Sequence, residues 1–353
     1  MTARLASIGT AVPERCITQQ DAEDVAARLT EANGRERAIR AIYQRSGVGS
    51  RGSVVLDADG SCTFYENGSG RVPSTRERLD RFLPAAAALA SDACASALST
   101  AEMDAASITH LITVSCTGFA APGVEHALIA SLGLPATVSR TNIGFMGCHG
   151  AVNALAVAKA FAESTPGARV LICCVELSTL HFQFADDPAM SVANALFADG
   201  AAAAVVTADE AGRGPRLLAT ESTVIPDSAE CMAWRVGDHG FEMGLSSRVP
   251  SVLADAVRPW VDGVLEKHGL AREGIRSWAI HPGGPRVLST VRGALDLGEG
   301  ACDASRGVLR EHGNMSSATV LFITDRLMRQ SDGLPLMGLA FGPGLSGEAF
   351  LLA

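Results

Sequence analysis

The chain has 353 residues, of which 47% are apolar and 19% are charged. This composition supports a large hydrophobic core and excludes a disordered chain. The formal net charge is −9, so we expect neither nucleic acid nor an anionic membrane surface as a partner. No apolar run approaches the roughly 20 residues of a membrane-spanning helix. The first thirteen residues lack the pattern of a secretion signal.

Nine cysteines are scattered along the chain, without a CxxC pair or a Cys/His cluster of zinc spacing. This distribution predicts a reduced, cytoplasmic protein with no metal site. Most of these thiols should be small core residues.

Helical and strand patterns alternate along the chain, which predicts an α/β fold. After a first strand at 4–8 come a helix, a strand, two helices and two strands, at 81–98, 110–115, 123–132, 147–163, 168–176 and 201–207. The same order recurs at 250–268, 277–281, 286–297, 315–328, 335–341 and 348–352. The recurrence predicts two equivalent halves, 1–213 and 214–353. The alternative is a doubly wound domain without internal symmetry.

Cys148 lies in a glycine-rich turn, Gly-Cys-His-Gly at 147–150, that opens a largely apolar helix. The N–H groups and partial positive charge of a helix N-terminus stabilise a thiolate, so Cys148 is a candidate nucleophile. The alternative is a thiol packed in the core. The adjacent His149 is a poor base for Cys148, because neighbouring helical residues point in different directions.

His281 ends an apolar strand and starts a Pro-Gly-Gly-Pro loop, whose glycines let a ligand approach the backbone. Asn314 opens the helix that corresponds, in the second half, to the helix after Cys148. Each residue alone has a structural explanation, a satisfied histidine or a helix N-cap. Together, the three side chains form a set able to hold a thiolate and polarise a carbonyl group.

These motifs resemble those of type III polyketide synthases, the group of chalcone and stilbene synthases within the thiolase-fold superfamily. The resemblance runs from about residue 80 to the C-terminus and rests on GCHG at 147–150, GARVL at 167–171, ALFADGA at 195–201, HPGGP at 281–285, GNMSSA at 313–318 and FGPGL at 341–345. It implies a five-layered αβαβα thiolase fold and a homodimer. It also implies that Cys148, His281 and Asn314 are the catalytic residues.

The resemblance further implies the reaction. A starter acyl-CoA transfers its acyl group to Cys148, and malonyl-CoA loses CO₂ with its thioester oxygen near His281 and Asn314. The resulting enolate attacks the acyl thioester, the cycle repeats, and the product cyclises to a pyrone or a phenol. The substrates are an acyl-CoA and malonyl-CoA, and no metal or other cofactor is needed.

The resemblance also assigns residues around the reacting groups. Those expected in the substrate pocket are Cys116, Phe119, Ala121, Phe182, Met243 and Ser316. Phe182 would stand as a gate between the CoA tunnel and the cavity. Arg40, Arg45 and Arg51 lie in the segment expected to contact the CoA phosphates. The alternatives are core packing for the pocket residues and a solvated helix face for the arginines.

Small side chains at Cys116, Ala120 and Ala121 suggest the class of starter. Larger groups would close the cavity floor there, so small ones predict room for a medium or long aliphatic acyl chain. The products would then be alkylpyrones or alkylresorcinols. Alternatively, Phe119 or Met243 fills the space and leaves a pocket for a short or aromatic starter.

Three other functions stay open from the sequence. A ketoacyl synthase of the same fold would carry out a single condensation. A cysteine hydrolase also orders Cys, His and Asn along its chain, but the doubled α/β unit and the missing papain-type motif count against it. A catalytically silent scaffold is the third, and the intact Cys/His/Asn set argues against it.

Overall fold

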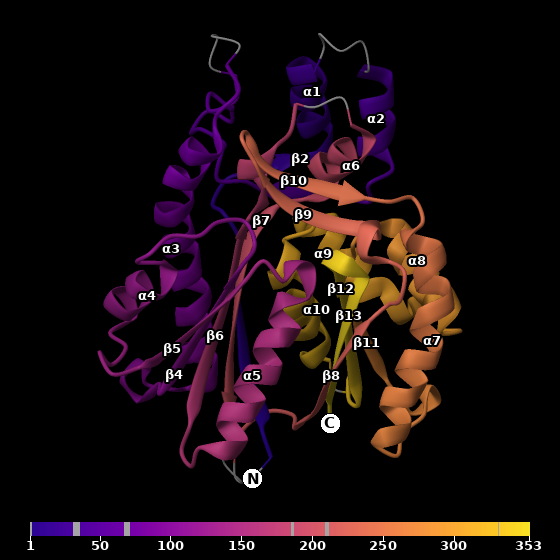
Figure 1. The fold of residues 1–353 in the computed structure, drawn as a ribbon. Coiled ribbons are helices and arrows are strands. Elements are labelled where there is room, and N and C mark those ends of the chain that lie inside the picture. The colour runs from indigo at the N-terminus through magenta and orange to yellow at the C-terminus, as the bar shows by residue number, and fades with distance from the viewer. Residues whose placement is uncertain (1, 31–35, 67–70, 185–186, 209–211, 331) are drawn as a thin grey trace.

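The computed structural model describes residues 2–30, 36–66, 71–184, 187–208, 212–330 and 332–353. Two sheets stand side by side at the centre of the molecule (Figure 1). The first sheet has the order β1 (Arg4–Ala11), β7 (Asp199–Thr207), β6 (Arg169–Leu177), β4 (His110–Ser115) and β5 (Ser139–Gly144). The second has the order β8 (Leu217–Val224), β13 (Ser346–Leu352), β12 (Leu336–Gly342) and β11 (Ser277–Ile280).

The two sheets repeat one pattern of strand pairing. β1 pairs with β7 as β8 pairs with β13, and both pairs are antiparallel. The antiparallel pair β6–β7 corresponds to β12–β13, and the parallel pair β4–β6 corresponds to β11–β12. The predicted duplication is therefore present in the topology, with β5 added at one edge. The boundary expected between residues 213 and 214 lies in the connection from β7 to β8 and stays a prediction.

Helices form three layers around the two sheets (Figure 1). One layer covers the outer face of the first sheet, one lies between the sheets, and one covers the outer face of the second. In that order they contain α3 (Thr75–Ala101) and α4 (Val124–Leu132), α5 (Gly150–Ser164) and α10 (Thr319–Met328), and α7 (Val249–Lys267) and α8 (Pro285–Ala294). The structure thus confirms the αβαβα thiolase fold.

The remaining elements were not part of the predicted repeat, and most lie at one end of the molecule, at the top of Figure 1. They are α1 (Gln19–Thr30), α2 (Glu36–Gln44), α6 (Pro188–Leu196), the pair β2 (Cys16–Thr18) and β3 (Ser50–Gly52), and the hairpin of β9 (Met232–Gly237) and β10 (Gly240–Leu245). Below them, α9 (Asp303–His312) packs against α10 and β3. These elements surround the carboxyl ends of β4, β6 and β11, where the candidate residues lie.

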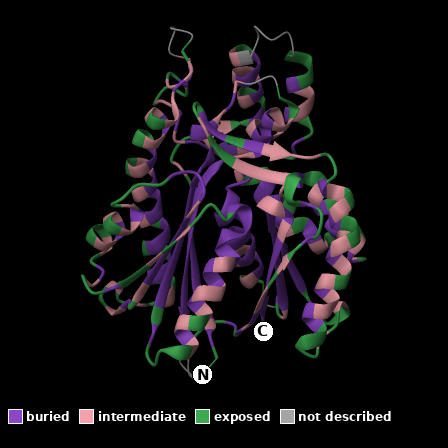
Figure 2. Ribbon diagram, in the orientation of Figure 1, coloured by how far each residue is buried: buried purple, intermediate pink, exposed green. Residues whose placement is uncertain are grey.

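Small residues let the layers approach closely. β7 has four successive alanines at 201–204, all fully buried between α3 on one face and α5 and α10 on the other. A Cβ on Gly9 of β1 would lie 2.3 Å from the backbone nitrogen of Ala97 in α3, so this contact requires glycine. In Figure 2 the sheets are largely buried, and exposed residues concentrate on the outer helices and loops.

α3 corrects one expectation from the sequence. It is the one helix of the described residues that is long and apolar enough to cross a membrane by length and composition. It begins with a capping box between Ser74 and Glu77 and packs along β1, β7 and β6. Its buried residues, including Phe82 and Leu89, belong to the core on the outer face of the first sheet.

We expect the substitution Gly9→Ala to lower the free energy of unfolding by about 1–3 kcal/mol, because the added methyl group meets the α3 backbone, which cannot turn aside. Gly263→Ala in α7 is the matched control, because a Cβ there has no neighbour within 4 Å. The control should raise stability by about 0.5–1 kcal/mol. Urea unfolding of both variants checks this. Equal stability of the two variants would contradict the close packing of α3 on β1.

Candidate functional site

Cys148 lies in a 3₁₀ turn, Gly147–His149, that leads directly into α5. Gly147 has a φ of +75°, and a Cβ there would lie 2.3 Å from Cδ of Pro343. The turn therefore requires glycine for both its backbone angle and its packing. Cys148 is buried and lines a small cavity of about 20 Å³.

Asn314 reaches the same turn from the second half of the chain. Its backbone N–H donates to the carbonyl of Leu196, and its carbonyl accepts from the N–H of Ala198, both at 2.9 Å. Its side-chain Oδ1 accepts from the N–H of Ser316 at 2.9 Å, which leaves the amide NH₂ group free to donate. Hydrogen bonding by the Asn314 side chain lowers the pKa of the Cys148 thiol.

His281 follows β11, and its N–H donates to the carbonyl of Leu339 at 2.8 Å. The residue is 1% exposed, and neither ring nitrogen has a hydrogen-bond partner among the described residues. Burial and the neighbouring His149 lower the pKa of His281 to about 3, so the imidazole is neutral. Both ring nitrogens are therefore available to a substrate.

Burial sets the charge of the reacting thiol. It raises the pKa of Cys148 to about 12, and the Glu176 carboxylate adds to this, while hydrogen bonds from Ser316 and Asn314 oppose it. The resting site thus holds a thiol and an uncharged imidazole. Burial thus opposes the stabilisation of a thiolate that the start of α5 is expected to give, and that expectation stays a prediction.

His149 does not serve as a base for Cys148, in agreement with the expectation. Its Nδ1 lies 2.8 Å from Oδ1 of Asn153, one turn further along α5. Its ring fills the space that a side chain on Gly342 would need, with Cδ2 2.4 Å from a Cβ built there. The imidazole is therefore packed against β12 rather than directed at the thiol cavity.

Glu176 is a buried carboxyl group that the sequence analysis missed. It has no exposed surface, and burial raises its pKa. It accepts hydrogen bonds from Oγ1 of Thr117 at 2.7 Å, from the N–H of Cys116 at 3.0 Å and from Oγ of Ser317 at 2.5 Å. A glutamate inside the apolar strand β6 was the available signal, because a carboxyl group is costly to bury without partners.

Three of the six predicted pocket residues line the Cys148 cavity, namely Cys116, Met243 and Ser316. The sulfur of Cys116 lies 3.2 Å from Oγ of Ser316. Phe197 and Trp234 line the same cavity and were not predicted. Phe197 stands inside the ALFADGA segment at 195–201, which marked the region but not the residue.

Phe182, Phe119 and Ala121 lie outside this cavity. Phe182 lines a larger, mostly apolar cavity of about 80 Å³ beside α1, and Phe197 is an aromatic residue that borders both cavities. Trp234 borders both cavities as well, and the gate expected at Phe182 stays a prediction. Phe119 and Ala121 are exposed, because the loop after β4 turns outward at Gly118, where the Phe82 ring leaves no room for a side chain.

Of the residues of the expected opening, Cys116 lines the Cys148 cavity and Ala120 and Ala121 do not. Ala120 and Ala121 are exposed. Trp234 covers Cys116, with its Nε1 donating to the Cys116 carbonyl at 2.6 Å. Trp234 and Met243 both line the cavity at this wall, and more room lies in the larger apolar cavity.

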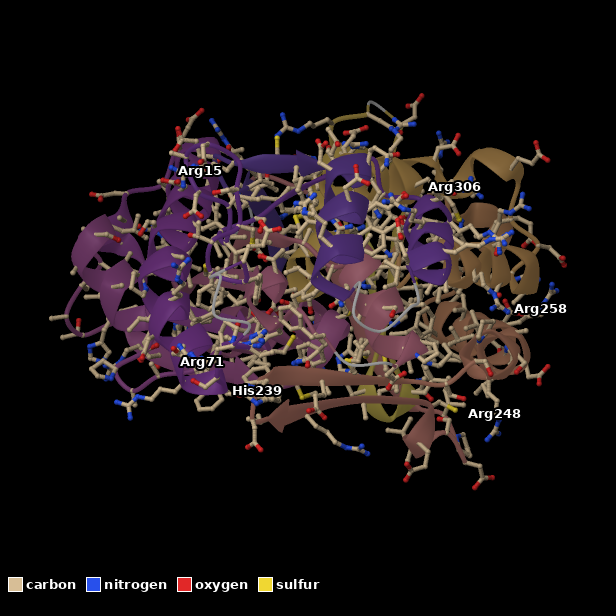
Figure 3. The ribbon with its side chains drawn as sticks, turned by 90° about the horizontal axis from the view of Figure 1, so that it is seen from above. Arg15, Arg71, His239, Arg248, Arg258 and Arg306 are labelled. Carbon is tan, nitrogen blue, oxygen red and sulfur yellow. The ribbon has the colours of Figure 1, made fainter. Side chains whose placement is uncertain are left out.

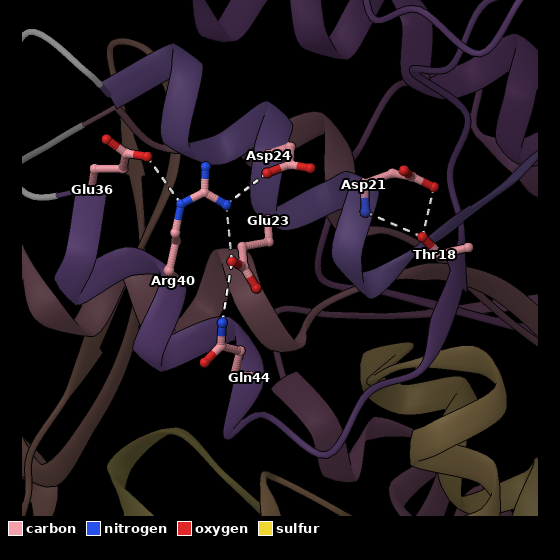
Figure 4. Close-up of polar contacts among 7 residues, drawn as sticks. All are labelled: Thr18, Asp21, Glu23, Asp24, Glu36, Arg40 and Gln44. Carbon is pink, nitrogen blue, oxygen red and sulfur yellow. Dashed lines mark hydrogen bonds and ion pairs between the residues drawn. The ribbon is translucent and has the colours of Figure 1, made fainter.

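Arg40 and Arg51 are both occupied by protein contacts. Arg40 forms ion pairs with Glu23, Asp24 and Glu36 at 3.0, 2.6 and 3.0 Å (Figure 4). These carboxylates raise the pKa of Arg40 and compensate its charge. Arg51 is 4% exposed and donates to backbone carbonyls, so its assignment as a CoA phosphate contact is wrong.

Arg45 is exposed just after α2. Two residues later, a Cβ on Gly47 would lie 3.0 Å from Cγ of Pro285, so this loop packs against the HPGGP segment. Other arginines lie apart around the rim of the molecule, as Figure 3 shows for Arg15, Arg71, Arg248, Arg258 and Arg306. Of the three predicted arginines, Arg45 alone stays a candidate for the CoA phosphates.

Comparisons with known proteins agree with this geometry. The family model described as chalcone and stilbene synthases, N-terminal domain, matches residues 1–210, and that of the C-terminal domain matches residues 216–353. The chain is 32% identical to the alpha-pyrone synthesis polyketide synthase-like Pks18 of Mycobacterium tuberculosis, over 98% of this chain and 89% of the relative. It is 33% identical to the 1,3,6,8-tetrahydroxynaphthalene synthase of Streptomyces peucetius, over 99% and 92%.

A solved structure has the same fold over almost the whole chain. The crystal structure of PKS-I from the brown alga Ectocarpus siliculosus superposes with a TM-score of 0.94 and 30% sequence identity. The match covers 99% of this chain and 98% of that one. The similarity therefore includes both sheets and all three helical layers.

We expect the rate of Cys148 alkylation by iodoacetamide to rise steadily between pH 6 and pH 10. A thiol with a pKa near 12 gains about tenfold in thiolate for each pH unit below that value. The measurement uses a Cys16→Ser background, because Cys16 is exposed. Asn314→Ala should slow the reaction at every pH, because it removes a hydrogen bond that lowers this pKa. A rate that is constant from pH 7 upward would contradict the neutral resting state.

Proposed function

The chain belongs to the chalcone and stilbene synthase family and is a type III polyketide synthase, and we propose that Cys148, His281 and Asn314 carry out its acyl transfer. Family membership removes the cysteine hydrolase as an alternative. The observation that carries the proposal is the geometry around one turn. The Asn314 side chain lowers the pKa of a buried thiol there, and the imidazole of His281, whose pKa the adjacent His149 also affects, has no hydrogen-bond partner at either ring nitrogen among the described residues.

The first step loads the starter. As the acyl-CoA fills the cavity, the Cys148 thiol passes its proton to the neutral imidazole of His281, and the thiolate attacks the thioester carbonyl. The new C–S bond forms, the bond to the CoA sulfur breaks, and the departing thiolate takes the proton from His281. Burial makes the charged intermediate state costly, so the thiol becomes reactive only with substrate in place.

The second step forms the new carbon–carbon bond. The amide of Asn314 and a ring N–H of His281 donate to the thioester oxygen of malonyl-CoA. They stabilise the negative charge that develops there as CO₂ leaves. The enolate carbon attacks the acyl group, the Cys148 thiolate leaves, and the longer chain departs on CoA. Transfer of this chain back to Cys148 begins the next round.

The reaction as proposed needs no metal or redox cofactor. Loss of CO₂ supplies the carbanion, and the side-chain donors of Asn314 and His281 stabilise the negative charge on the thioester oxygen. CoA itself belongs to the substrates. We assign its phosphate groups to Arg45, which is exposed beside the HPGGP loop.

We also propose that the protein is a homodimer that joins at β5. This strand is at the edge of the first sheet, and within the described part of the chain it pairs with β4 alone. Next to it, Phe119, Phe145 and Met146 are exposed by 56%, 38% and 38%. An open sheet edge beside an exposed apolar group is typical of an interface. The cytoplasm is the proposed location, which the unpaired state of all nine cysteines supports.

The larger apolar cavity suggests where an aliphatic starter would lie. It is lined by side chains of α1, by the loop around Val55 and Tyr65, and by Phe182. It shares four residues with the Cys148 cavity, namely Ser178, Phe197, Trp234 and Met243. We propose that the acyl chain passes this shared wall and extends toward α1. This moves the predicted tunnel away from Ala121.

We expect the substitution Ala22→Trp to lower kcat/KM for medium and long acyl-CoA starters by roughly tenfold or more, because the indole fills the cavity beside α1. Priming with acetyl-CoA should change little, and Ala22→Ser should leave both activities unchanged. Steady-state assays with an acyl-CoA series check this. If Ala121→Trp suppressed the long starters and Ala22→Trp did not, the chain would lie at the wall first expected from the sequence.

We expect Cys148→Ala to form no polyketide but to retain release of CO₂ from malonyl-CoA. The variant cannot hold an acyl group, whereas His281 and Asn314 can still stabilise the enolate. Radiolabelled CO₂ and product mass are measured on the same samples, with Cys116→Ala as the control for loss of a neighbouring buried thiol. Product formation by Cys148→Ala near the parent rate would remove Cys148 from the nucleophile role.

A further inference from the structure

Arg51 of β3 is a buried arginine that holds the end of α6. Its Nη1 donates to the carbonyls of Asn194 and Phe197 at 2.7 and 2.8 Å, and its Nη2 donates to that of Ala195 at 2.7 Å. These carbonyls lie in the last turn and the C-cap of α6, where helix carbonyls lack partners within the helix. The cation thus meets the negative end of the helix dipole.

Neighbouring side chains hold the Arg51 guanidinium against the carbonyls of α6. Its Nη2 also donates to Oε1 of Gln19, and its Cζ lies 5.7 Å from the centre of the Tyr43 ring. Burial lowers its pKa, while Tyr43 and the carboxylate of Asp199 raise it from a distance. The Nε of Arg51 has no partner among the described residues, so the Nη contacts with Gln19 and the α6 carbonyls are what compensates the burial of this cation.

The segment that Arg51 holds continues directly into the thiol cavity. Phe197 lines that cavity, and its neighbours Leu196 and Ala198 form the two backbone hydrogen bonds to Asn314. A Cβ on Gly313 would lie 2.8 Å from Cβ of Ala198 and 3.5 Å from Cβ of Arg51. Arg51, the end of α6 and the backbone before Asn314 are therefore closely packed, and a side chain at Gly313 would not fit between them.

We propose that Arg51 is a positioning residue for the decarboxylation step. By fixing the end of α6 it fixes Phe197 at the cavity and the backbone of Asn314, and so the amide that donates to the malonyl thioester. This inference rests on the proposed function of Asn314. An arginine suits the role because its planar fork reaches three carbonyls at once, whereas the single nitrogen of a lysine cannot.

Arg78 provides a matched control for the loss of a buried guanidinium. It is fully buried and donates to the carbonyls of Pro73, Leu180 and Phe182 at 3.0, 2.8 and 2.9 Å. None of these carbonyls belongs to the segment bonded to Asn314. Replacement of Arg78 thus imposes a similar cost on the fold without acting on the amide donor.

The test compares two partial reactions in Arg51→Lys and Arg78→Lys. One is acylation of Cys148 by a starter acyl-CoA, followed by intact-protein mass, and the other is release of CO₂ from malonyl-CoA. In Arg51→Lys we expect kcat for CO₂ release to fall at least roughly tenfold more than the acylation rate, with little change in KM. A displacement of about 1 Å costs up to ~10² in rate. In Arg78→Lys, which acts on Phe182 beside the proposed starter cavity, CO₂ release should fall no more than the acylation rate.

Equal losses in both reactions of Arg51→Lys would overturn the inference and leave Arg51 with a role in the fold alone. A parent protein that is neither acylated nor releases CO₂ would overturn the proposed function, and the inference with it. If Arg51→Lys does not fold, Gln19→Leu decides. It removes an acceptor of Arg51 and a second donor to the Ala195 carbonyl, at 3.0 Å, but leaves the arginine in place. It should show the same selective loss to a smaller degree, and equal losses would again overturn the inference.

Discussion

The burial of Cys148 where the two halves meet is the constraint on which the site depends. The thiol precedes α5 and Asn314 precedes α10, and both helices lie between the same two sheets. This duplication brings an amide from one half to a sulfur from the other. The same burial raises the pKa of the Cys148 thiol and lowers the pKa of His281, so it favours the uncharged form of both groups. Reactivity must therefore come from donors already in position when the substrate arrives, rather than from a standing ion pair.

Buried polar groups hold the residues around the Cys148 cavity in place through hydrogen bonds to backbone carbonyl and N–H groups and to neighbouring hydroxyls. Glu176 accepts hydrogen bonds from Ser115, Cys116, Thr117 and Ser317, and the strand-like contact between residues 196–198 and Asn314 joins the first half to the second. Each of these groups would be costly to bury alone and is stable because its partners are present. Movement of one of these groups would leave another without its hydrogen-bond partner. The walls of the cavity are therefore expected to stay fixed while the acyl chain of the substrate grows.

Much of this could be predicted from the sequence, because the relevant signals are local. Alternating helical and strand patterns were enough for most strands of the two sheets, although β5 and β8 were missed, and short motifs were enough for the turn at Cys148 and the loop at His281. The errors come from contacts between distant residues. Trp234 meets Cys116 across 118 positions. Arg51 was expected at the CoA phosphates from the resemblance of its segment, but the carbonyls to which it donates lie more than 140 residues away. The direction of the loop that exposes Phe119 depends on the Phe82 ring.

The central claim is that one buried thiol carries a chain through repeated condensations. Its most direct test is mass spectrometry of a single reaction with an acyl-CoA starter and isotopically labelled malonyl-CoA, which reads both the products and the acylated protein. The account predicts products that contain more than one labelled acetate unit, and an acyl group on the peptide that contains Cys148 during turnover. A product limited to one acetate unit, or an acyl group on any other residue, would contradict it.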